Sequence, residues 1–357
     1  YVTGGIGATH LGEAFSFNYD LPNDTAYSET CAAIGLVFFA RRMLEIKPDR
    51  SFSDVMERAL CNTVLAGMAA DGKSFFYVNP LEVYPKACHE DARKFHVKPI
   101  RQKWFGCACC PPNIARLLSS LAMYAYTENE DTLFAHLFVG GSVKKDVNGK
   151  ELSFEVTTDM PWQGTTVYSC TNEQSVHGSL AIRIPEWSRS FKVSGVTGEL
   201  DENSAQLRDG YLYITHDWKK GDTVRLERSM EPEFIAANNE VREDINKTAL
   251  RRGPFIYCLE EADNGTDLHT ISVCAAAKPE TVMMNIAGTD VAALRIDGKK
   301  LINVCDSPDV DAETKTAPLY TTLKKPEYKD VKLTYVPYYA WNNRGEGEMS
   351  VWVNYIL

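Results

Sequence analysis

Hydrophobic positions follow two different periods along the chain, and the change comes near residue 130. Before it, the run "ETCAAIGLVFFARRMLEI" places Ile34, Val37, Phe38 and Met43 on one side of a helix. The runs "SDVMERALCNTVLAGM" and "PPNIARLLSSLAMYAYT" repeat this spacing, and the second starts with prolines, which a first helical turn tolerates. We therefore predict that the main helices lie before residue 130 and pack on both sides in an all-α layer.

After residue 130 the apolar positions alternate with a period of two. The run "SLAIRIPEW" alternates Leu180, Ile182 and Ile184, and the short runs "DGYLYITH" and "GDTVRLE" follow Asp-Gly or Gly-Asp turns. Short strands separated by turns about every ten residues are typical of antiparallel β-sandwiches. About 225 residues are too many for one sandwich, so we predict two.

Composition narrows the class of protein. The 357 residues allow two or three domains, and 44% hydrophobic and 24% charged residues are typical of a globular protein. The net charge of −10 argues against a nucleic-acid partner, and no apolar run approaches the ~20 residues that span a bilayer. The chain starts with Tyr1 and shows no signal peptide. We expect it to be the C-terminal part of a longer polypeptide.

Three cysteines crowd into "WFGCACCPPN", directly before a predicted helix. Amide groups at a helix N-terminus favour a thiolate over a thiol. The segment "YSETCAA" adds Glu29 and Cys31 at another helix start, so Glu29, Cys31, Cys109 and Cys110 could form a four-ligand zinc shell. The cysteine cluster alone fits buried apolar residues equally well. Together with Glu29 and Cys31, it favours a metal site.

The remaining cysteines give no disulfide pattern. Cys109 and Cys110 are adjacent, and a disulfide between neighbours is strained. Isolated cysteines in apolar surroundings are predicted to be buried; they are Cys61, Cys170, Cys258, Cys274 and Cys305. Reduced thiols indicate a reducing compartment or a metal, and we expect a cytoplasmic protein.

A glycine-rich stretch, "GGIGATHLGEAF", contains the polar residues Thr9, His10 and Glu13. It lacks the spacing of a dinucleotide-binding loop, and no strand–helix–strand unit follows it. A glycine-rich loop with one carboxylate is suited to line a pocket close to a ligand. A solvated loop explains the same residues equally well.

Several segments together resemble a known family. These are "GGIGATHLGEAF", "DLPNDTAYSETCA", "FFYVNPLE", "WFGCACCPPNIARL", "LAIRIPEWS", "RRGPFIYC" and "VPYYAWNNRGEGEMSVW". In this order they resemble bacterial β-L-arabinofuranosidases of glycoside hydrolase family 127, from residue 1 to the C-terminus. The resemblance implies the C-terminal part of an (α/α)6 catalytic barrel in residues 1–127. It also implies a β-sandwich in residues 128–232, joined by a returning strand in residues 339–357, and a second sandwich in residues 233–338.

The resemblance also implies the roles of the site residues. Cys109 matches the nucleophile, which is also a zinc ligand with Cys110, Cys31 and Glu29. Glu13 matches the general acid/base, and Tyr77 and His10 are expected to contact the sugar. Cys107 matches no catalytic position. The implied substrate is an arabinose-containing oligosaccharide or glycoconjugate, from which L-arabinose is released with retention of configuration.

One departure and three alternatives stay open. The family barrel has twelve helices, whereas this chain shows three strong helical runs, so the missing N-terminal barrel segment must come from the same polypeptide or a separate chain. A homodimer is also left open. The alternatives are a non-catalytic carbohydrate-binding protein with a structural zinc, a thiol redox protein using Cys107 and Cys109, and a hydrolase acting on another plant cell-wall sugar.

Overall fold

The computed structural model describes residues 1–305, 320 and 322–356, and it confirms that the main helices lie before residue 130. The helical segment contains α1 (Thr30–Ile46), α2 (Arg50–Ala59), η1 (Leu60–Val64), α3 (Pro85–Glu90), η2 (Ala92–Lys94), α4 (Cys110–Ser119) and α5 (Ala122–Ala125). Within the described residues, no helix is both long and apolar enough to cross a membrane.

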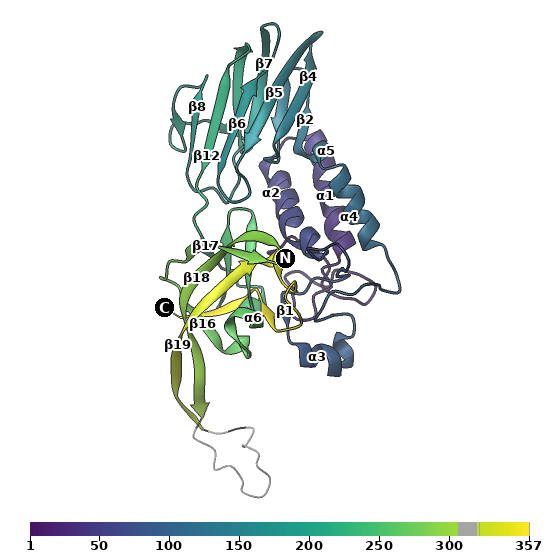
Figure 1. The fold of residues 1–357 in the computed structure, drawn as a ribbon, viewed down its shortest axis with the longest axis vertical. Helices are drawn as coiled ribbons and strands as arrows, with labels where there is room; N and C mark the ends of the chain where they lie inside the picture. Colours follow the sequence, from purple (N-terminus) through teal and green to yellow (C-terminus); the bar gives the residue numbers. More distant parts are fainter. Residues whose placement is uncertain (306–319, 321, 357) are drawn as a thin grey trace, which may run out of the picture.

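The three predicted helical runs pack against one another. Ile34 and Val37 of α1 share a buried core with Met56 of α2 and with Ile114 and Leu117 of α4. These residues recur at helical spacing, so each helix has an apolar stripe, and α1 packs against both α2 and α4. In Figure 1, α1, α2 and α4 lie side by side below the upper β region.

Two sheets follow, and their facing sides share one core. One sheet has the order β10-β11-β7-β3-β2 and the other β4-β5-β6-β12-β8-β9. The apolar core between them includes Phe154, Tyr168, Ile182, Val193 and Trp218. Their strands are β2 (Tyr126–Glu128), β3 (Thr132–Ala135), β4 (Gly141–Val147), β5 (Lys150–Thr158), β6 (Thr165–Cys170), β7 (Val176–Arg183), β8 (Phe191–Gly195), β9 (Leu200–Asp201), β10 (Leu207–Arg208), β11 (Tyr211–Trp218) and β12 (Thr223–Arg228).

The described strands after residue 232, together with β1, form a third, ten-stranded sheet with the order β1-β20-β15-β19-β18-β16-β21-β14-β13, and β17 pairs with β18. Its strands are β1 (Glu82–Val83), β13 (Glu233–Ile235), β14 (Lys247–Arg252), β15 (Phe255–Glu260), β16 (Ile271–Cys274), β17 (Glu280–Ile286), β18 (Thr289–Cys305), β19 (Leu323–Pro337), β20 (Met349–Ser350) and β21 (Val353–Ile356). Short helices η3 (Arg242–Asp244), α6 (Glu261–Asn264), η4 (Leu268–Thr270) and η5 (Tyr338–Ala340) connect them.

This sheet differs from the predicted second sandwich because its hydrogen bonding is continuous. β15 pairs with both β14 and β19, so the path from β15 through β19, β18, β16, β21 and β14 closes on itself. Alternate side chains of β15 pack into two different hydrophobic cores. Tyr257 and Leu259 face the inside of the closed sheet, whereas Ile256 and Cys258 face the helical segment. Alternation predicts strands, but it does not specify which strands pair or whether a sheet closes.

We predicted that the last strand returns to the β-sandwich of residues 128–232, the first β region, and this prediction is wrong. β21 pairs antiparallel with β14 and parallel with β16, and β20 pairs with β15, all within the third sheet. The apolar pattern of "MSVWVNYIL" specifies a buried strand but does not name its partner. The partner follows from packing, since Met349, Val351 and Trp352 join the core between this sheet and the helical segment.

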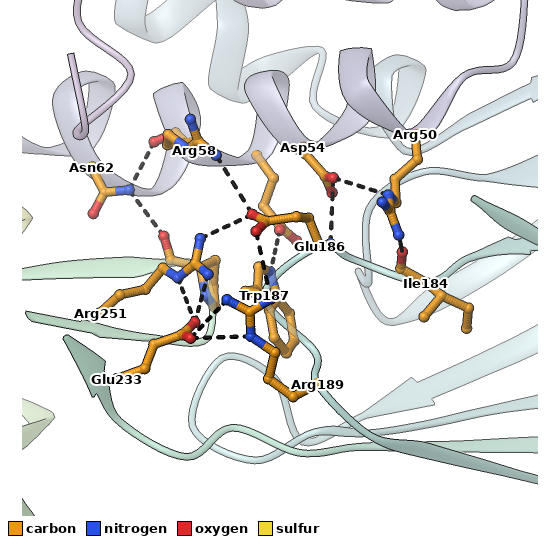
Figure 2. Close-up of polar contacts among 12 residues, drawn as sticks. Arg50, Asp54, Arg58, Asn62, Ile184, Glu186, Trp187, Arg189, Glu233 and Arg251 are labelled. Atoms are coloured by element: carbon orange, nitrogen blue, oxygen red, sulfur yellow. Dashed lines mark hydrogen bonds and ion pairs between the residues drawn. The ribbon is translucent and has the colours of Figure 1, made fainter. Parts of the chain in front are cut away.

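A buried polar junction fixes the helical segment to both β regions (Figure 2). The Arg183 guanidinium, 0% exposed at the end of β7, donates to Asp54 Oδ1 at 2.7 Å and to Glu57, both on α2. Trp187 Nε1 donates to Glu57 Oε2 at 2.8 Å. Glu186 then bridges to Arg251 of β14 at 3.0 Å. Buried ionic groups of this kind must all stay paired.

We expect Glu57→Ala to destabilise the protein by about 3–5 kcal/mol, because it removes one carboxylate from the buried Arg183 and the acceptor from Trp187. The matched control is Glu151→Ala, which removes a solvent-exposed ion pair with Lys144 and should change stability by less than about 1 kcal/mol. Urea unfolding measures both variants. Equal losses in the two variants would contradict the role assigned to the junction.

Candidate active site and metal centre

The N-terminal ends of two helices meet and bring four metal-ligating side chains together. Glu29 is the N-cap of α1 and Cys31 lies in its first turn. Cys109 is the N-cap of α4 and Cys110 is its first residue, with prolines in the first turn as predicted. Unpaired amide groups give both helix ends a partial positive charge. Each end therefore favours an anionic side chain, and the two ends converge.

The four ligand atoms of Glu29, Cys31, Cys109 and Cys110 all lie within 4.8 Å of one another. Cys109 Sγ is 3.7 Å from Glu29 Oε1 and 3.7 Å from Cys110 Sγ. Asn113 Nδ2, one turn into α4, donates to Cys31 Sγ at 3.1 Å. Glu29 and Cys110 are buried, and the other two thiols are half-buried. The structure thus gathers the four residues that the sequence proposed as ligands.

The electrostatics of this cluster limit how much negative charge it holds. Burial raises the pKa of Glu29 to about 7 and that of Cys109 to about 12. The hydrogen bond from Cys110 lowers the pKa of Cys31 to about 6, and the same contact raises the pKa of the Cys110 thiol. One ionised thiol thus suppresses ionisation of its neighbours. Three sulfurs and one carboxylate oxygen form a donor set that fits a divalent, sulfur-accepting cation.

Backbone contacts at the start of α1 position a second segment, residues 75–79, beside the cluster. Thr30 N donates to Tyr77 O at 2.9 Å, and Thr30 Oγ1 donates to Phe76 O at 2.9 Å. Asn79 Nδ2 donates to Ser28 O at 3.0 Å. Because extended side chains alternate, Phe76 enters the core while Tyr77 points to the site.

Tyr77 lies between the predicted acid/base and the predicted nucleophile. Its hydroxyl donates to Glu13 Oε1 at 3.5 Å and also contacts the Cys109 thiol. Tyr27, 5% exposed, donates to the same Glu13 oxygen at 2.7 Å. Glu13 itself is exposed, on a tight turn closed by pairing of Thr9 with Ala14. The glycine-rich stretch therefore delivers its carboxylate to the cluster instead of forming a separate loop.

His10 and Cys107 lie on the rim of this arrangement. The His10 ring stacks on His96 with centroids 4.2 Å apart and contacts neither Glu13 nor the four-residue cluster through its side chain in any described hydrogen bond. With Tyr27 and Tyr77, both histidines line an open cleft of about 380 Å³, which Cys107 also lines. Sequence reasoning missed Tyr27, although it lies two residues before Glu29, and it missed His96.

The nine cysteines whose side chains are described are all free thiols, so Cys107 and Cys109 form no disulfide. Cys170 and Cys258 are buried as predicted, whereas Cys61 and Cys274 are partly exposed. The side chain of Cys305 lies outside the described residues. The thiol redox alternative gains no support from this arrangement.

The chain has a helical segment with a Cys–Glu cluster, followed by β regions. Comparison with known protein families shows that this order is that of a class of glycoside hydrolases. Residues 1–123 match the β-L-arabinofuranosidase GH127 catalytic domain, residues 132–230 the GH127 middle domain, and residues 232–354 the glycoside hydrolase family 127 C-terminal domain. The chain belongs to glycoside hydrolase family 127.

Individual relatives agree with this assignment. The chain is 38% identical to a non-reducing end β-L-arabinofuranosidase of Bifidobacterium longum, with 98% of this chain and 52% of the relative covered. It superposes on a GH127 β-L-arabinofuranosidase of Geobacillus stearothermophilus T6 with a TM-score of 0.92 at 44% identity, covering 100% of this chain and 54% of that one. A further GH127 β-arabinofuranosidase structure matches with a TM-score of 0.85 at 34% identity. The chain spans about half the length of these relatives.

The pKa pattern predicts which thiol reacts first in metal-free protein. At pH 7, Cys31 should be mostly thiolate and Cys109 mostly thiol, since their pKa values are about 6 and about 12. In a Cys107→Ser background, which removes the exposed competing thiol, iodoacetamide should label Cys31 faster than Cys109 after chelation. Peptide mass spectrometry reads the rates. A sulfur-binding divalent cation should protect Cys31, and equal labelling with and without it would contradict a metal site.

Proposed function

We propose that the protein is a retaining glycoside hydrolase that releases L-arabinose from β-L-arabinofuranosides. The observation that carries this proposal is the position of Tyr77, whose hydroxyl contacts both Glu13 and Cys109. A retaining glycosidase needs an acid on the leaving-group side and a nucleophile on the opposite side of the sugar. Contact of one carboxylate and one thiol with the same hydroxyl brings a candidate acid and a candidate nucleophile close together, which supports this mechanism.

The chain's own residues account for each step. Glu13 protonates the glycosidic oxygen while the sulfur of Cys109 forms a bond to the anomeric carbon and the leaving group departs. Glu13, now a carboxylate, takes a proton from a water molecule, whose oxygen displaces the Cys109 sulfur and releases the sugar. Tyr27 orients Glu13 through its hydrogen bond at 2.7 Å. Two inversions at the anomeric carbon give net retention.

The thiol of Cys109 requires activation, because its pKa of about 12 leaves it protonated at neutral pH in the absence of a cation. We propose that Glu29, Cys31, Cys109 and Cys110 hold a zinc ion. Bound zinc would favour the thiolate forms of its cysteine ligands. The N-terminus of α4 acts in the same direction, since Cys109 is its N-cap.

The domain organisation that we propose follows from the same family. Residues 1–127 would be part of an (α/α)6 barrel, residues 128–232 a β-sandwich, and residues 233–338 with the chain end a second β domain. Large side chains exposed on the helical segment support a further barrel segment that covers them; they are Leu11, Phe15, Phe17, Phe39, Ile46 and Trp104. Free thiols, including the exposed Cys107, fit a reducing compartment such as the bacterial cytoplasm.

Zinc content tests the metal proposal directly. The natural polypeptide should contain about one zinc ion per chain, because the four donors match a closed tetrahedral site. Cys31→Ser removes a ligand that is not the nucleophile and should lower the zinc content strongly, whereas the control Cys107→Ser should retain it. Elemental analysis after dialysis measures both. Zinc-free wild-type protein purified without chelators, or equal zinc in the two variants, would refute the assignment.

Glu13→Gln tests the catalytic roles. The amide can still accept from Tyr27, so fold and metal content should be kept, while the rate falls by on the order of 10²–10⁴ for lack of proton transfer. An aryl arabinofuranoside with an activated leaving group should still form the covalent adduct on Cys109, which mass spectrometry can locate.

The matched control is Glu199→Gln, an exposed glutamate in the first β region, which should retain full activity. A non-catalytic carbohydrate-binding protein with a structural zinc predicts no turnover in any variant, and a hydrolase of another sugar predicts turnover of other aryl glycosides only. Unchanged activity in Glu13→Gln, or an adduct on another residue, would overturn the assigned roles.

A further inference from the structure

A second cleft, of about 340 Å³, lies where the helical segment meets the third sheet. β1 lines one side, and β14, β20, β21 and η4 line the other. Val83 and Trp352 belong to the core beneath the helical segment, whereas Leu268 and Val353 belong to the core inside the closed sheet. The cleft therefore opens at the boundary of two cores, and such boundaries are common places for ligand pockets of roughly 300–1,000 Å³.

This cleft is separate from the candidate active site, since none of its described lining residues belongs to the metal cluster or to the cleft beside Glu13. Its walls are fixed by backbone contacts. Glu348, 7% exposed, accepts hydrogen bonds from Asp267 N at 3.0 Å and Leu268 N at 2.8 Å. Lys247 of β14 pairs with Asn354 of β21 in the ladder. Walls held in this way make the cleft a pre-formed pocket.

Three polar side chains of the cleft lack a partner. Glu82, Lys247 and Tyr84 line it, and none of their side chains makes a hydrogen bond or an ion pair with another described residue. A carboxylate accepts hydrogen bonds, an ammonium donates them, and a phenol does both. Because each hydroxyl of a sugar also donates and accepts, a ligand with several hydroxyls can satisfy all three groups.

The charges that line the cleft balance one another. Two lysines, Lys94 and Lys247, face two glutamates, Glu82 and Glu348. Lys94 already forms an ion pair with Asp24, and both carboxylate oxygens of Glu348 accept backbone amides. One unpaired cation and one unpaired anion are left. This lining favours a neutral polar ligand over a phosphate, a polyanion or a cation.

Aromatic side chains supply an apolar surface next to these polar groups. Tyr84 is 47% exposed, and Trp352, 7% exposed, lines the same cleft. A sugar ring has an apolar C–H face that packs on an aromatic ring, while its hydroxyls reach the polar side chains. We propose that this cleft is a second carbohydrate-binding site, which holds neutral sugar and takes no part in bond cleavage. The proposal goes beyond the proposed hydrolase function and does not depend on it.

Calorimetric titration of the natural polypeptide with a neutral arabinofuranose disaccharide tests this site. A Glu13→Gln background prevents turnover during the titration. Adding Tyr84→Ala should weaken one class of binding sites by roughly tenfold, because the aromatic face is lost. Tyr84→Phe keeps the ring and should bind more tightly than Tyr84→Ala. The matched control is Tyr328→Ala, a tyrosine of β19 that is 41% exposed and does not line the cleft.

The outcomes separate this site from the hydrolase proposal. With Glu13 intact, Tyr84→Ala should hydrolyse 4-nitrophenyl β-L-arabinofuranoside as fast as the unmodified protein. Finding no sugar-binding site that Tyr84→Ala weakens more than Tyr328→Ala does would overturn the proposal, and so would tighter binding of anionic digalacturonate than of the neutral disaccharide. No turnover by the unmodified protein would refute the hydrolase function, whereas a site weakened by Tyr84→Ala would still support the second cleft.

Discussion

The convergence of two helix N-termini is the constraint on which the rest of the site depends. Glu29 and Cys31 lie at the start of α1, and Cys109 and Cys110 lie at the start of α4. Two pairs of donors, about 80 positions apart in sequence, therefore meet where both helix ends favour negative charge. Close packing of Gly67 against Thr30, the first residue of α1, holds the start of this helix in place. A Cβ on Gly67 would lie 2.7 Å from the Thr30 side chain, so only glycine lets that segment approach.

The β regions contribute to the site by packing behind it. Phe76, the neighbour of Tyr77, stacks on Trp341 with ring centroids 4.8 Å apart, and Arg101 donates to Trp341 O at 2.7 Å in the same core. On the other side, the hydrogen bond from Arg183 to Asp54 fixes α2 against β7. The third sheet and the helical segment thus share one core, and the orientation of Tyr77 depends on residues more than 200 positions away in sequence.

The sequence predicted what local patterns encode and missed what packing decides. Helical periodicity located α1, α2 and α4, and the helix-start context of Glu29 and Cys31 located half of the cluster. The partner of the last strand was not predictable, because an apolar strand fits any unpaired edge until its neighbours are placed. Tyr27 was missed for a related reason: a buried tyrosine reads as core, and only its hydroxyl contact with Glu13 reveals its role.

The two carboxylates of the site, Glu29 and Glu13, lie in different environments. Glu29 is buried among three sulfurs, where burial raises its pKa to about 7 and a nearby cation would be needed to hold its charge. Glu13 is exposed and held by two tyrosine hydroxyls, a setting that suits the acid/base role that we propose for it. In other hydrolases, a similar difference in environment lets two carboxylates take different roles. Tyr77 lies between them, and its single hydroxyl contacts both Glu13 and the Cys109 thiol, so it couples the positions of these two side chains.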